Sequence, residues 1–361
     1  MANDYVSKVL TGPAAKRFGD LWHLVGNTPM LRVDYMYKGK PDSIYVKCEH
    51  YNLTGSIKDR MALYILHRAY AQRLIAPDDV IVEATSGNTG IAFAAIGRAL
   101  GHDVKIIMPD WLSKERVDII KSLGAEIVLV SKEAGGFMGS IRMSEEMAAH
   151  GGVFLPRQFE NCFNAEAHER TTMEEIWRQL ATINLKPDAF VAGVGTGGTI
   201  RGAANCFKKR DATIAVHPLE PAESPTLSTG YKVGAHRIQG ISDEFIPAIV
   251  QFGALDGVVQ SGDGDAIIMA QQLARSLGLA VGISSGANVV GAIKIKERLG
   301  PDATVVTVLC DCNKKYLSTD LFRTEPEREG YISVDTRLIG YEPLSRLENS
   351  VLDTMDGTFV N

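Results

Sequence analysis

The alternation of short apolar runs, rich in Val and Ile, with longer amphipathic stretches is the feature of this chain that most constrains its fold. Short apolar strands that alternate with helices are typical of parallel sheets covered by helices on both faces. The predicted strands are Ser43–Cys48, Val80–Ala84, Val104–Met108, Glu126–Val130, Phe190–Val194, Ile214–Leu219 and Thr304–Leu309. The predicted helices are Ile57–Tyr70, Gly90–Leu100, Lys114–Leu123, Phe137–His150, Ala165–Leu180, Gly198–Lys208 and Ala287–Leu299. We therefore expect an α/β protein with two open, mostly parallel sheets flanked by helices.

Length and charge narrow the class of protein. At 361 residues the chain is long enough for about two domains. Its 38 basic and 43 acidic residues give a net charge of −5, which is not the basic footprint of a nucleic-acid-binding protein. No apolar run reaches the roughly 20 residues that a spanning helix needs, and the first residues lack the segments of a secretory signal. We expect no nucleic-acid partner and no membrane association.

Cysteine usage indicates the compartment. The five cysteines are scattered, and an odd number without a secretory signal fits a reducing environment, so we expect a cytoplasmic protein. Only Cys310 and Cys312 are close-spaced. No second pair of Cys or His residues accompanies them, so we expect no metal site.

Glycine is enriched, with 35 residues in 361 against a usual ~7%. Much of the excess falls in three segments where a predicted strand runs into a Gly/Ser/Thr loop and then a helix: Val80–Gly90, Phe190–Thr199 and Ala280–Ala287. Glycine lets the backbone approach a ligand, and a helix N-terminus attracts an anion. One such loop could be an ordinary turn, but three together favour a ligand site.

Gly195-Thr-Gly-Gly-Thr199 is the best phosphate cradle among these loops, because small residues and two hydroxyls follow one another. It is not a P-loop, since no Gly-Lys-Ser/Thr follows, and its spacing is not that of the dinucleotide fingerprint. A phosphate-bearing cofactor other than a nucleotide is left open.

Lys58 lies in the first turn of a predicted helix, behind a turn of Asn, Thr, Gly and Ser. A cation opposes the helix dipole there, but the same field with burial lowers the pKa of an amine, as a Schiff-base lysine requires. The alternative is an exposed lysine paired with Asp59 or Glu49. Together, the lysine and the phosphate cradle point to pyridoxal 5′-phosphate, an aldehyde with a phosphate arm.

The motifs that carry these residues occur in the order seen in the cysteine synthase family. They are Asn-x-Thr-Gly-Ser-x-Lys-Asp-Arg, Thr-Ser-Gly-Asn-Thr-Gly, Gly-Thr-Gly-Gly-Thr and Gly-Ile-Ser-Ser-Gly-Ala, with Val25-Gly-Asn-Thr-Pro29, Gln158-Phe-x-Asn161, Thr171-Thr172, Glu175-Ile-Trp177 and His236-x-Ile-Gln-Gly240. The resemblance runs from about Leu24 to Phe322. This family of fold-type II pyridoxal-phosphate enzymes includes O-acetylserine sulfhydrylase, which the chain most resembles, and cystathionine β-synthase. The resemblance implies a tryptophan synthase β-like fold with the active site in the interdomain cleft.

The resemblance also implies roles for particular residues. Lys58 would hold the cofactor as an internal aldimine and later move the α-proton, and Asn88 would lie against the ring hydroxyl. The residues implied for the substrate are Thr85, Ser86, Gly87, Asn88 and Thr89, with Gln158 and the backbone of Gly240. The residues implied for the cofactor phosphate are Gly195, Thr196, Gly197, Gly198 and Thr199.

The implied reaction is β-replacement on an activated L-serine, O-acetylserine, through an α-aminoacrylate, with sulfide as nucleophile to give L-cysteine. Alternatives with the same first half-reaction use O-phosphoserine or serine as donor, or homocysteine (giving cystathionine) or an amine (giving a diaminopropionate-type product) as nucleophile. Serine or threonine dehydration would need that half-reaction alone. From another class, the protein could be an idle homologue that acts as a binding partner.

Two positions depart from the family pattern. Leu309-Cys-Asp-Cys-Asn-Lys-Lys-Tyr316 aligns with Leu-Pro-x-Ser-Gly-x-Arg-Tyr, which places Cys312 at the serine that bonds the pyridine nitrogen. A thiol is a weaker but neutral partner, which favours β-elimination, whereas Asp311 turned inward would reverse that argument. Arg201 stands where sulfhydrylases often have a small or apolar residue. It is either a solvated helix residue or a contact for an anionic donor or an acidic second substrate.

For the domains, we expect an N-terminal segment (1–47) packed on the larger domain, a smaller α/β domain (48–160) with a mobile part near 104–148, a larger α/β domain (161–335) and an extension (336–361). Leu338–Asn361 has scattered apolar residues with no clear pattern typical of a β-strand. We expect it to pack on the surface or on a partner subunit, or to stay partly mobile. The resemblance implies a homodimer, amino-acid substrates and a possible complex with the tail of serine acetyltransferase.

Overall fold

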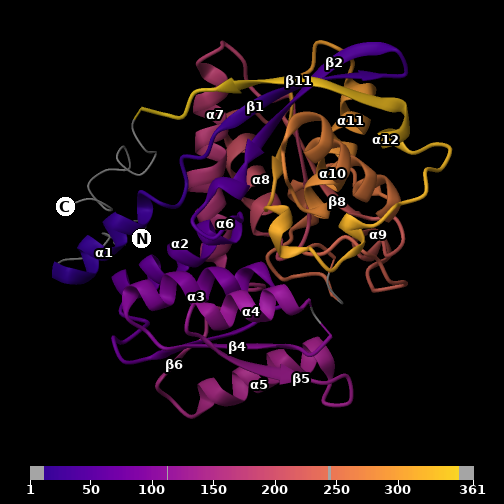
Figure 1. Ribbon diagram of the computed structural model, residues 1–361. Helices are drawn as coiled ribbons and strands as arrows, with labels where there is room; N and C mark the ends of the chain where they lie inside the picture. Colours follow the sequence, from indigo (N-terminus) through magenta and orange to yellow (C-terminus); the bar gives the residue numbers. More distant parts are fainter. Residues whose placement is uncertain (1–11, 112, 243–244, 349–361) are drawn as a thin grey trace.

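Two β-sheets flanked by helices make up the molecule, whose computed structural model describes residues 12–111, 113–242 and 245–348 (Figure 1). The larger sheet has the strand order β11-β1-β2-β10-β7-β8-β9, and the smaller has the order β5-β4-β3-β6. The smaller sheet is wholly parallel. The larger is parallel from β2 to β9 and antiparallel at the β11-β1-β2 edge. The predicted fold class is therefore confirmed.

The strands of the larger sheet are β1 (Met30–Tyr37), β2 (Lys40–Cys48), β7 (Ala189–Gly193), β8 (Ala215–Pro221), β9 (Val259–Ser261), β10 (Val305–Leu309) and β11 (Thr336–Leu344). Those of the smaller sheet are β3 (Val80–Ala84), β4 (Val104–Pro109), β5 (Glu126–Val130) and β6 (Val153–Phe154). The α-helices are α1 (Gly12–Trp22), α2 (Lys58–Ala71), α3 (Asn88–Leu100), α4 (Lys114–Ser122), α5 (Gly136–Ala149), α6 (Cys162–Ala167), α7 (Met173–Ala181), α8 (Gly198–Arg210), α9 (Thr226–Thr229), α10 (Asp263–Leu277), α11 (Ile283–Leu299) and α12 (Ile332–Asp335).

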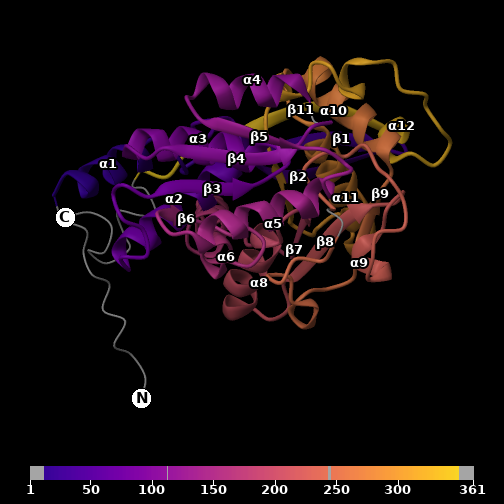
Figure 2. The same cartoon turned by 90° about the horizontal axis from the view of Figure 1, so that it is seen from below.

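Burial on both faces explains why the central strands read as continuous apolar runs. Every residue of β10 is buried, as are the first four residues of β7. In the smaller sheet, α3 and α4 cover the face toward the larger domain and α5 covers the other (Figures 1 and 2). Every predicted strand is confirmed, and β3 and β5 have the predicted bounds.

Two predicted helices differ from the structure in an informative way. The helix expected at Ala165–Leu180 consists of α6 and α7 joined by a π-helical segment, His168–Thr172. The helix expected at Ala287–Leu299 begins four residues earlier, at Ile283, so that the Ser-Ser-Gly part of the third glycine loop forms the first turn of α11. Single-turn π-helices occur frequently at functional sites.

The expectation that residues 1–47 pack together on the larger domain is corrected. Strands β1 and β2 do belong to the larger sheet, but α1 packs on α2 and α3. The ring of Phe18 contacts those of His67 and Tyr70 edge-on, at centroid distances of 5.1 and 5.3 Å. The amphipathic α1 therefore completes the core of the smaller domain.

The C-terminal extension is also corrected. Residues 336–344 form β11, an antiparallel strand along β1 that runs across the top of the molecule in Figure 1. Leu338 and Leu344 are buried, whereas Ile339 and Tyr341 are exposed. The apolar residues are scattered because one face of this edge strand packs on the core while the other remains open to solvent. Residues 345–348 follow β11, and the last part of the predicted extension, residues 349–361, lies outside the described residues.

Candidate active site

A cavity between the two sheets brings together most of the residues singled out in the sequence. Its walls come from the N-termini of α2, α3, α8 and α11, from the ends of β7 and β10, and from α4 and two loops. The lining residues that the sequence predicted are Lys58, Thr85, Ser86, Gly87, Asn88, Thr89, Gln158, Gly195, Thr196, Gly197, Thr199 and Gly240. In open α/β folds, ligands bind beyond the carboxyl ends of the strands, which is where these loops meet.

Lys58 is the first residue of α2 and lines the cavity. The start of this helix is fixed by its neighbours: the Ile57 amide donates to the Cys310 carbonyl at 2.9 Å. Asp59 accepts hydrogen bonds from the amide and the hydroxyl of Thr54, at 2.7 and 2.5 Å. Burial raises the pKa of the Asp59 carboxyl to about 6. Asp59 thus caps the turn that presents Lys58.

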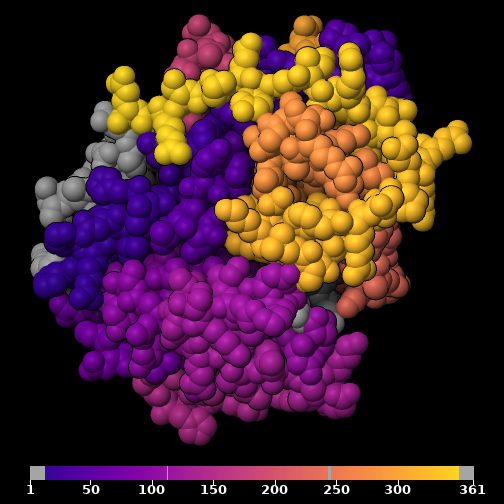
Figure 3. Space-filling model, viewed as in Figure 1, coloured from indigo at the N-terminus to yellow at the C-terminus, as the bar shows by residue number. Residues whose placement is uncertain are grey.

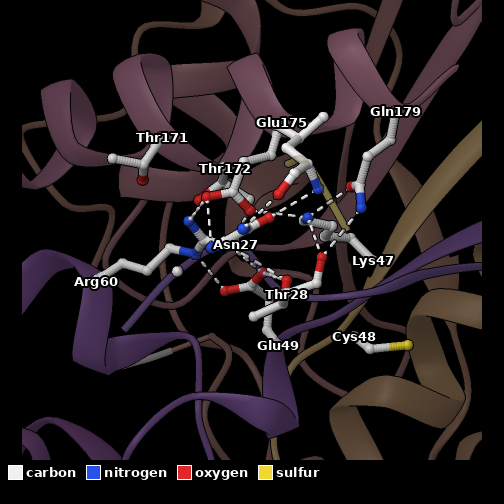
Figure 4. A network of polar contacts seen from close by, with 12 residues as sticks. Asn27, Thr28, Lys47, Cys48, Glu49, Arg60, Thr171, Thr172, Glu175 and Gln179 are labelled. Atoms are coloured by element: carbon white, nitrogen blue, oxygen red, sulfur yellow. Dashed lines mark hydrogen bonds and ion pairs between the residues drawn. The ribbon is translucent and has the colours of Figure 1, made fainter. Parts of the chain in front are cut away.

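The ion-pair partner of Glu49 is Arg60, which together with Glu175 and Lys47 forms a buried network behind Lys58 (Figure 4). Arg60 Nε lies 2.6 Å from Glu49 Oε2, and Lys47 Nζ lies 2.8 Å from Glu175 Oε2. Burial alone would raise the pKa of the Glu175 carboxyl, but the Arg60 and Lys47 charges lower it to about 2. Two acids and two bases therefore neutralise one another in the interior.

The Gly195–Thr199 loop joins β7 to α8 in a conformation that larger residues would not permit. Gly197 has φ +85°, in the left-handed region. A Cβ on Gly195 would lie 2.4 Å from the Gly240 carbonyl oxygen, and one on Gly198 would lie 1.9 Å from Asn164 Oδ1. The tight loop at the N-terminus of α8 suits a phosphate, as the sequence predicts.

The Thr85–Thr89 loop joins β3 to α3 and is tied to Gln158. Thr89 Oγ1 donates to Gln158 Oε1 at 2.6 Å, and Gln158 Nε2 donates to the Ala84 carbonyl at 2.9 Å. The structure thus brings both predicted carboxylate-binding elements together at the N-terminus of α3, where an anion is stabilised.

Asn88 faces the cavity with one amide atom engaged. Its Nδ2 donates to Asp311 Oδ2 at 2.6 Å, while its Oδ1 is buried without a hydrogen-bond partner among the described residues. A buried acceptor without a donor is costly, so it suits a hydroxyl on a ligand. The contact of Asn88 with a ring hydroxyl remains a prediction, and this open acceptor is compatible with it.

The alignment that assigned Cys312 to the cofactor is corrected by the geometry. Cys310 and Ser284 line the cavity, and Cys312 does not. The chain turns after β10, and Cys312 Sγ would lie 3.1 Å from a Cβ on Gly55. Ser284, in the first turn of α11, contributes a hydroxyl-bearing side chain to the cavity wall.

Asp311 is fully buried, and its carboxylate turns toward Asn88 and accepts a hydrogen bond from the Tyr316 hydroxyl. It is not among the lining residues, so it supports Asn88 from behind. Arg201, one turn into α8, does not line the cavity either. The anion-binding interpretation of Arg201 has no contact in the structure to support it.

His168 is a site residue that the sequence analysis missed. It begins the π-helical segment; its Nδ1 lies 2.9 Å from Thr172 Oγ1 and its Nε2 lies 3.4 Å from Thr199 Oγ1. Burial, together with the charges of Lys58 and Arg60, lowers the pKa of His168 to about 3. A neutral imidazole therefore supports Thr199 of the phosphate cradle.

The residues present fit pyridoxal phosphate. The two charged side chains among the described lining residues are Lys58 and Arg116, both cationic, which suits a phosphate and a carboxylate. Asn88 Oδ1 offers an acceptor to a ring hydroxyl. Within the described ranges, no three His, Cys, Asp or Glu side chains come together as a metal site, and no helix is long and apolar enough to span a bilayer.

Comparison with known proteins gives one consistent family. Residues 21–311 match the family model described as "Pyridoxal-phosphate dependent enzyme". A Bacillus subtilis (strain 168) protein named "Probable cysteine synthase" is 41% identical over 300 residues, which cover 83% of this chain and 96% of that protein.

Two solved structures extend this similarity. A hydrogen sulfide-producing enzyme from Fusobacterium nucleatum is 54% identical, with a TM-score of 0.88 over 90% of this chain and 97% of that one. O-ureido-L-serine synthase is 33% identical, with a TM-score of 0.79 over 89% and 98% of the two chains. The similar proteins differ in the reactions that they are named for.

Proposed function

The chain belongs to the pyridoxal-phosphate-dependent enzymes and is an enzyme of the cysteine synthase type, and on this premise we propose that it converts O-acetyl-L-serine and sulfide into L-cysteine and acetate. The observation that carries the proposal is the Thr89–Gln158 pair, which faces the same cavity as Lys58 and the Gly195–Thr199 cradle. A lysine, a phosphate site and a carboxylate site in one cavity are what β-replacement on an amino acid requires.

Each element has a role in this proposal. Bound pyridoxal phosphate supplies the electron sink for bond breaking at the substrate's α- and β-carbons. Gly195–Thr199 holds its phosphate, and Ser284 is the neutral hydroxyl for its ring nitrogen. The Thr85–Thr89 loop and Gln158 bind the substrate carboxylate and orient the α-hydrogen toward Lys58. Lys58 Nζ attaches the cofactor and then accepts the α-proton.

The charges of the cavity favour an acetyl rather than a phosphate leaving group. Arg116 is the permanent cation beside Lys58 among the described lining residues, and its Nη1 is directed to the Ser86 carbonyl, 3.3 Å away. The donor's carboxylate and the cofactor's phosphate already carry more negative charge than these two side chains can offset. A doubly charged leaving group would have to be held without a further cation.

A second candidate follows from the 54% identity to a hydrogen sulfide-producing enzyme. The same residues would release sulfide from L-cysteine, because sulfide is then the leaving group at the β-carbon and Lys58 removes the same α-proton. Water would take the place of sulfide as the nucleophile, giving L-serine, or elimination would go on to pyruvate and ammonia. The two candidates use one site and differ in donor and nucleophile.

The test gives the purified holoenzyme one donor at a time: O-acetylserine, O-phosphoserine, serine or cysteine. Each is tried with sulfide, homocysteine, an amine or no added nucleophile, and products are quantified by mass spectrometry. We expect equimolar L-cysteine and acetate from O-acetylserine and sulfide as the fastest reaction. Sulfide released from L-cysteine as the fastest reaction would support the second candidate instead. Turnover of no donor would leave the idle binding partner as the surviving interpretation.

Assembly, partner and location remain predictions of the family resemblance. A homodimer predicts twice the chain mass in light scattering. A serine acetyltransferase complex predicts that a synthetic peptide of that enzyme's C-terminal tail competes with O-acetylserine for the cavity. A cytoplasmic location predicts recovery of the protein with the cytoplasmic fraction of its cells.

A further inference from the structure

The N-terminus of α4, on the smaller domain, reaches across to the segment that follows β10 in the larger domain. The Glu115 carboxylate accepts two hydrogen bonds from Ser318, from the amide at 2.8 Å and from the hydroxyl at 2.9 Å. In Figure 3, the yellow-orange segment that contains residue 318 lies directly against the magenta surface of the smaller domain. Glu115 belongs to α4 of the smaller domain and Ser318 to the segment after β10 of the larger one, so this contact joins the two domains.

The next residue, Arg116, turns inward and is 3% exposed. Its guanidinium lies 5.1 Å from the centroid of the Tyr316 ring. On its other side it lies against Gly87, where an added Cβ would be 2.8 Å from Arg116 Nε. Among the described residues its Nε has no hydrogen-bond partner. A desolvated cation is thus held by an aromatic face and by the backbone of the carboxylate-binding loop.

The contacts continue from Tyr316 to the cofactor side of the cavity. The Tyr316 hydroxyl donates to Asp311, and the same carboxylate oxygen accepts Asn88 Nδ2. Tyr316 and Asp311 are fully buried. Burial and the Asp311 charge raise the pKa of the Tyr316 hydroxyl well above its usual value, so this hydroxyl remains a donor. One line of contacts therefore runs from α4 through Tyr316 and Asp311 to Asn88.

We propose that Arg116 is a positioning residue for the amino-acid substrate. When Glu115 and Ser318 are hydrogen-bonded, Tyr316 and Gly87 hold Arg116 in place. Arg116 then fixes the Thr85–Thr89 loop and adds a positive charge beside it. We call Glu115, Arg116, Tyr316 and Ser318 the interdomain clasp. The inference rests on the proposed function, because it assumes that the loop binds a carboxylate. It goes further by making amino-acid affinity depend on a contact between the domains.

The interdomain clasp predicts that a mutation which opens it changes the affinity for the amino acid and the affinity for the cofactor to different extents. The cofactor is held mainly by Lys58 and by Gly195–Thr199, which the clasp does not touch, so opening the clasp should weaken cofactor binding much less than amino-acid binding. The Thr85–Thr89 loop loses its backing and its neighbouring cation, so amino-acid binding weakens. A general loss of folding would weaken both.

The test measures the dissociation constant of L-cysteine by titrating the absorbance of the holoenzyme's cofactor. L-cysteine is the product of the first candidate reaction and the substrate of the second, so it enters this site under either, and the absorbance is read in a stopped-flow mixer before turnover. Glu115→Ala should raise this constant about tenfold, as expected for the loss of hydrogen bonds to a charged group. Asp118→Ala is the matched control, because Asp118 lies on the same helix in an exposed pair with Lys114. It should leave the constant unchanged.

Arg116→Leu should raise the constant about tenfold or more, and Arg116→Lys should restore much of the affinity by keeping the charge. Hydrogen exchange gives an independent readout: the Ser318 amide should exchange faster in Glu115→Ala and at the wild-type rate in Asp118→Ala. Equal L-cysteine affinity in Glu115→Ala and wild type would overturn the proposal. So would an equal loss of cofactor and L-cysteine affinity. Failure to form L-cysteine from O-acetylserine and sulfide would instead count against the proposed function alone.

Discussion

The guanidinium of Arg60 and the carboxylate of Glu175 form a two-pronged ion pair in the interior, with Nη1 2.7 Å from Oε1 and Nη2 2.7 Å from Oε2. Arg60 follows Lys58 by two residues on α2, and Glu175 lies on α7. The pair therefore ties the turn that presents the lysine to the helix that follows the π-helical segment.

Removing this cation should destabilise the protein strongly. Arg60→Met leaves Glu49 and Glu175 buried without their main partner, so the free energy of unfolding should fall by about 3–5 kcal/mol. The loss is measured by urea denaturation of the holoenzyme. Arg142→Met removes an exposed pair with Glu146 and should cost less than about 1 kcal/mol. Equal urea midpoints for the two variants would show that the buried network contributes little.

Adding a methyl group at Gly195 should weaken cofactor binding. The new Cβ would lie 2.4 Å from the Gly240 carbonyl oxygen, so the loop must open. Overpacking of this kind costs about 1–3 kcal/mol, which corresponds to a cofactor dissociation constant raised by about tenfold or more. Gly253→Ala is the control, since nothing lies within 4 Å of its added Cβ. Unchanged cofactor affinity in Gly195→Ala would count against the phosphate cradle.

The stability of the protein should fall as the pH rises toward 8. Burial raises the pKa of the Glu83 carboxyl to about 8, whereas in the unfolded chain it is near its usual value of about 4.3. The folded state therefore binds the extra proton between these values, and its stabilising effect is lost as the pH rises through them. Glu83→Gln cannot ionise, so its urea midpoint should change less than that of wild type between about pH 5 and 8. Parallel midpoint curves for the two proteins would contradict the assignment.

Neighbouring residues of β11 should respond differently to truncation. Leu338 is 9% exposed and packs on the larger sheet's core, whereas Ile339 is 54% exposed. Leu338→Ala should lower the free energy of unfolding by about 2–4 kcal/mol, and Ile339→Ala should change it by less than about 0.5 kcal/mol. Thermal denaturation of the two variants measures the difference. If both lost the same stability, the strand would not alternate as the structure shows.

The central strands were predictable from sequence because they are buried on both faces. Val305–Leu309 is buried throughout and apolar except for Thr307, and its signal is local. Strand β11 was missed because it is half exposed and pairs with a strand from the other end of the chain, β1, in which Asp34 lies opposite Gly340. Strand β1 was also missed, although none of its residues is fully exposed. Pairing at such a sequence distance leaves no mark in a local window, although the alternation along β1 offered a weak signal.

The site was predictable where its residues are contiguous and hard to predict where they meet only in space. Strand-to-helix loops carry Lys58, Thr85–Thr89 and Gly195–Thr199, and the residue types within each loop indicate what it binds. His168 and Arg116 lie in ordinary helical sequence and reach the site only through tertiary packing. Cys312 was misassigned because its position depends on how the chain turns after β10, where Cys310 rather than Cys312 lines the cavity.

The central claim is that Lys58 carries the cofactor and drives cysteine formation. It is tested most directly by comparing wild type with Lys58→Ala and with Lys114→Ala, an exposed lysine at the start of α4. Each holoenzyme is given O-acetylserine and sulfide, and borohydride reduction followed by peptide mass spectrometry locates the attached cofactor. We predict L-cysteine in wild type and Lys114→Ala, cofactor on the peptide that contains Lys58, and a loss of at least about a thousandfold in rate for Lys58→Ala. Cofactor on another lysine, or undiminished cysteine formation by Lys58→Ala, would contradict the account.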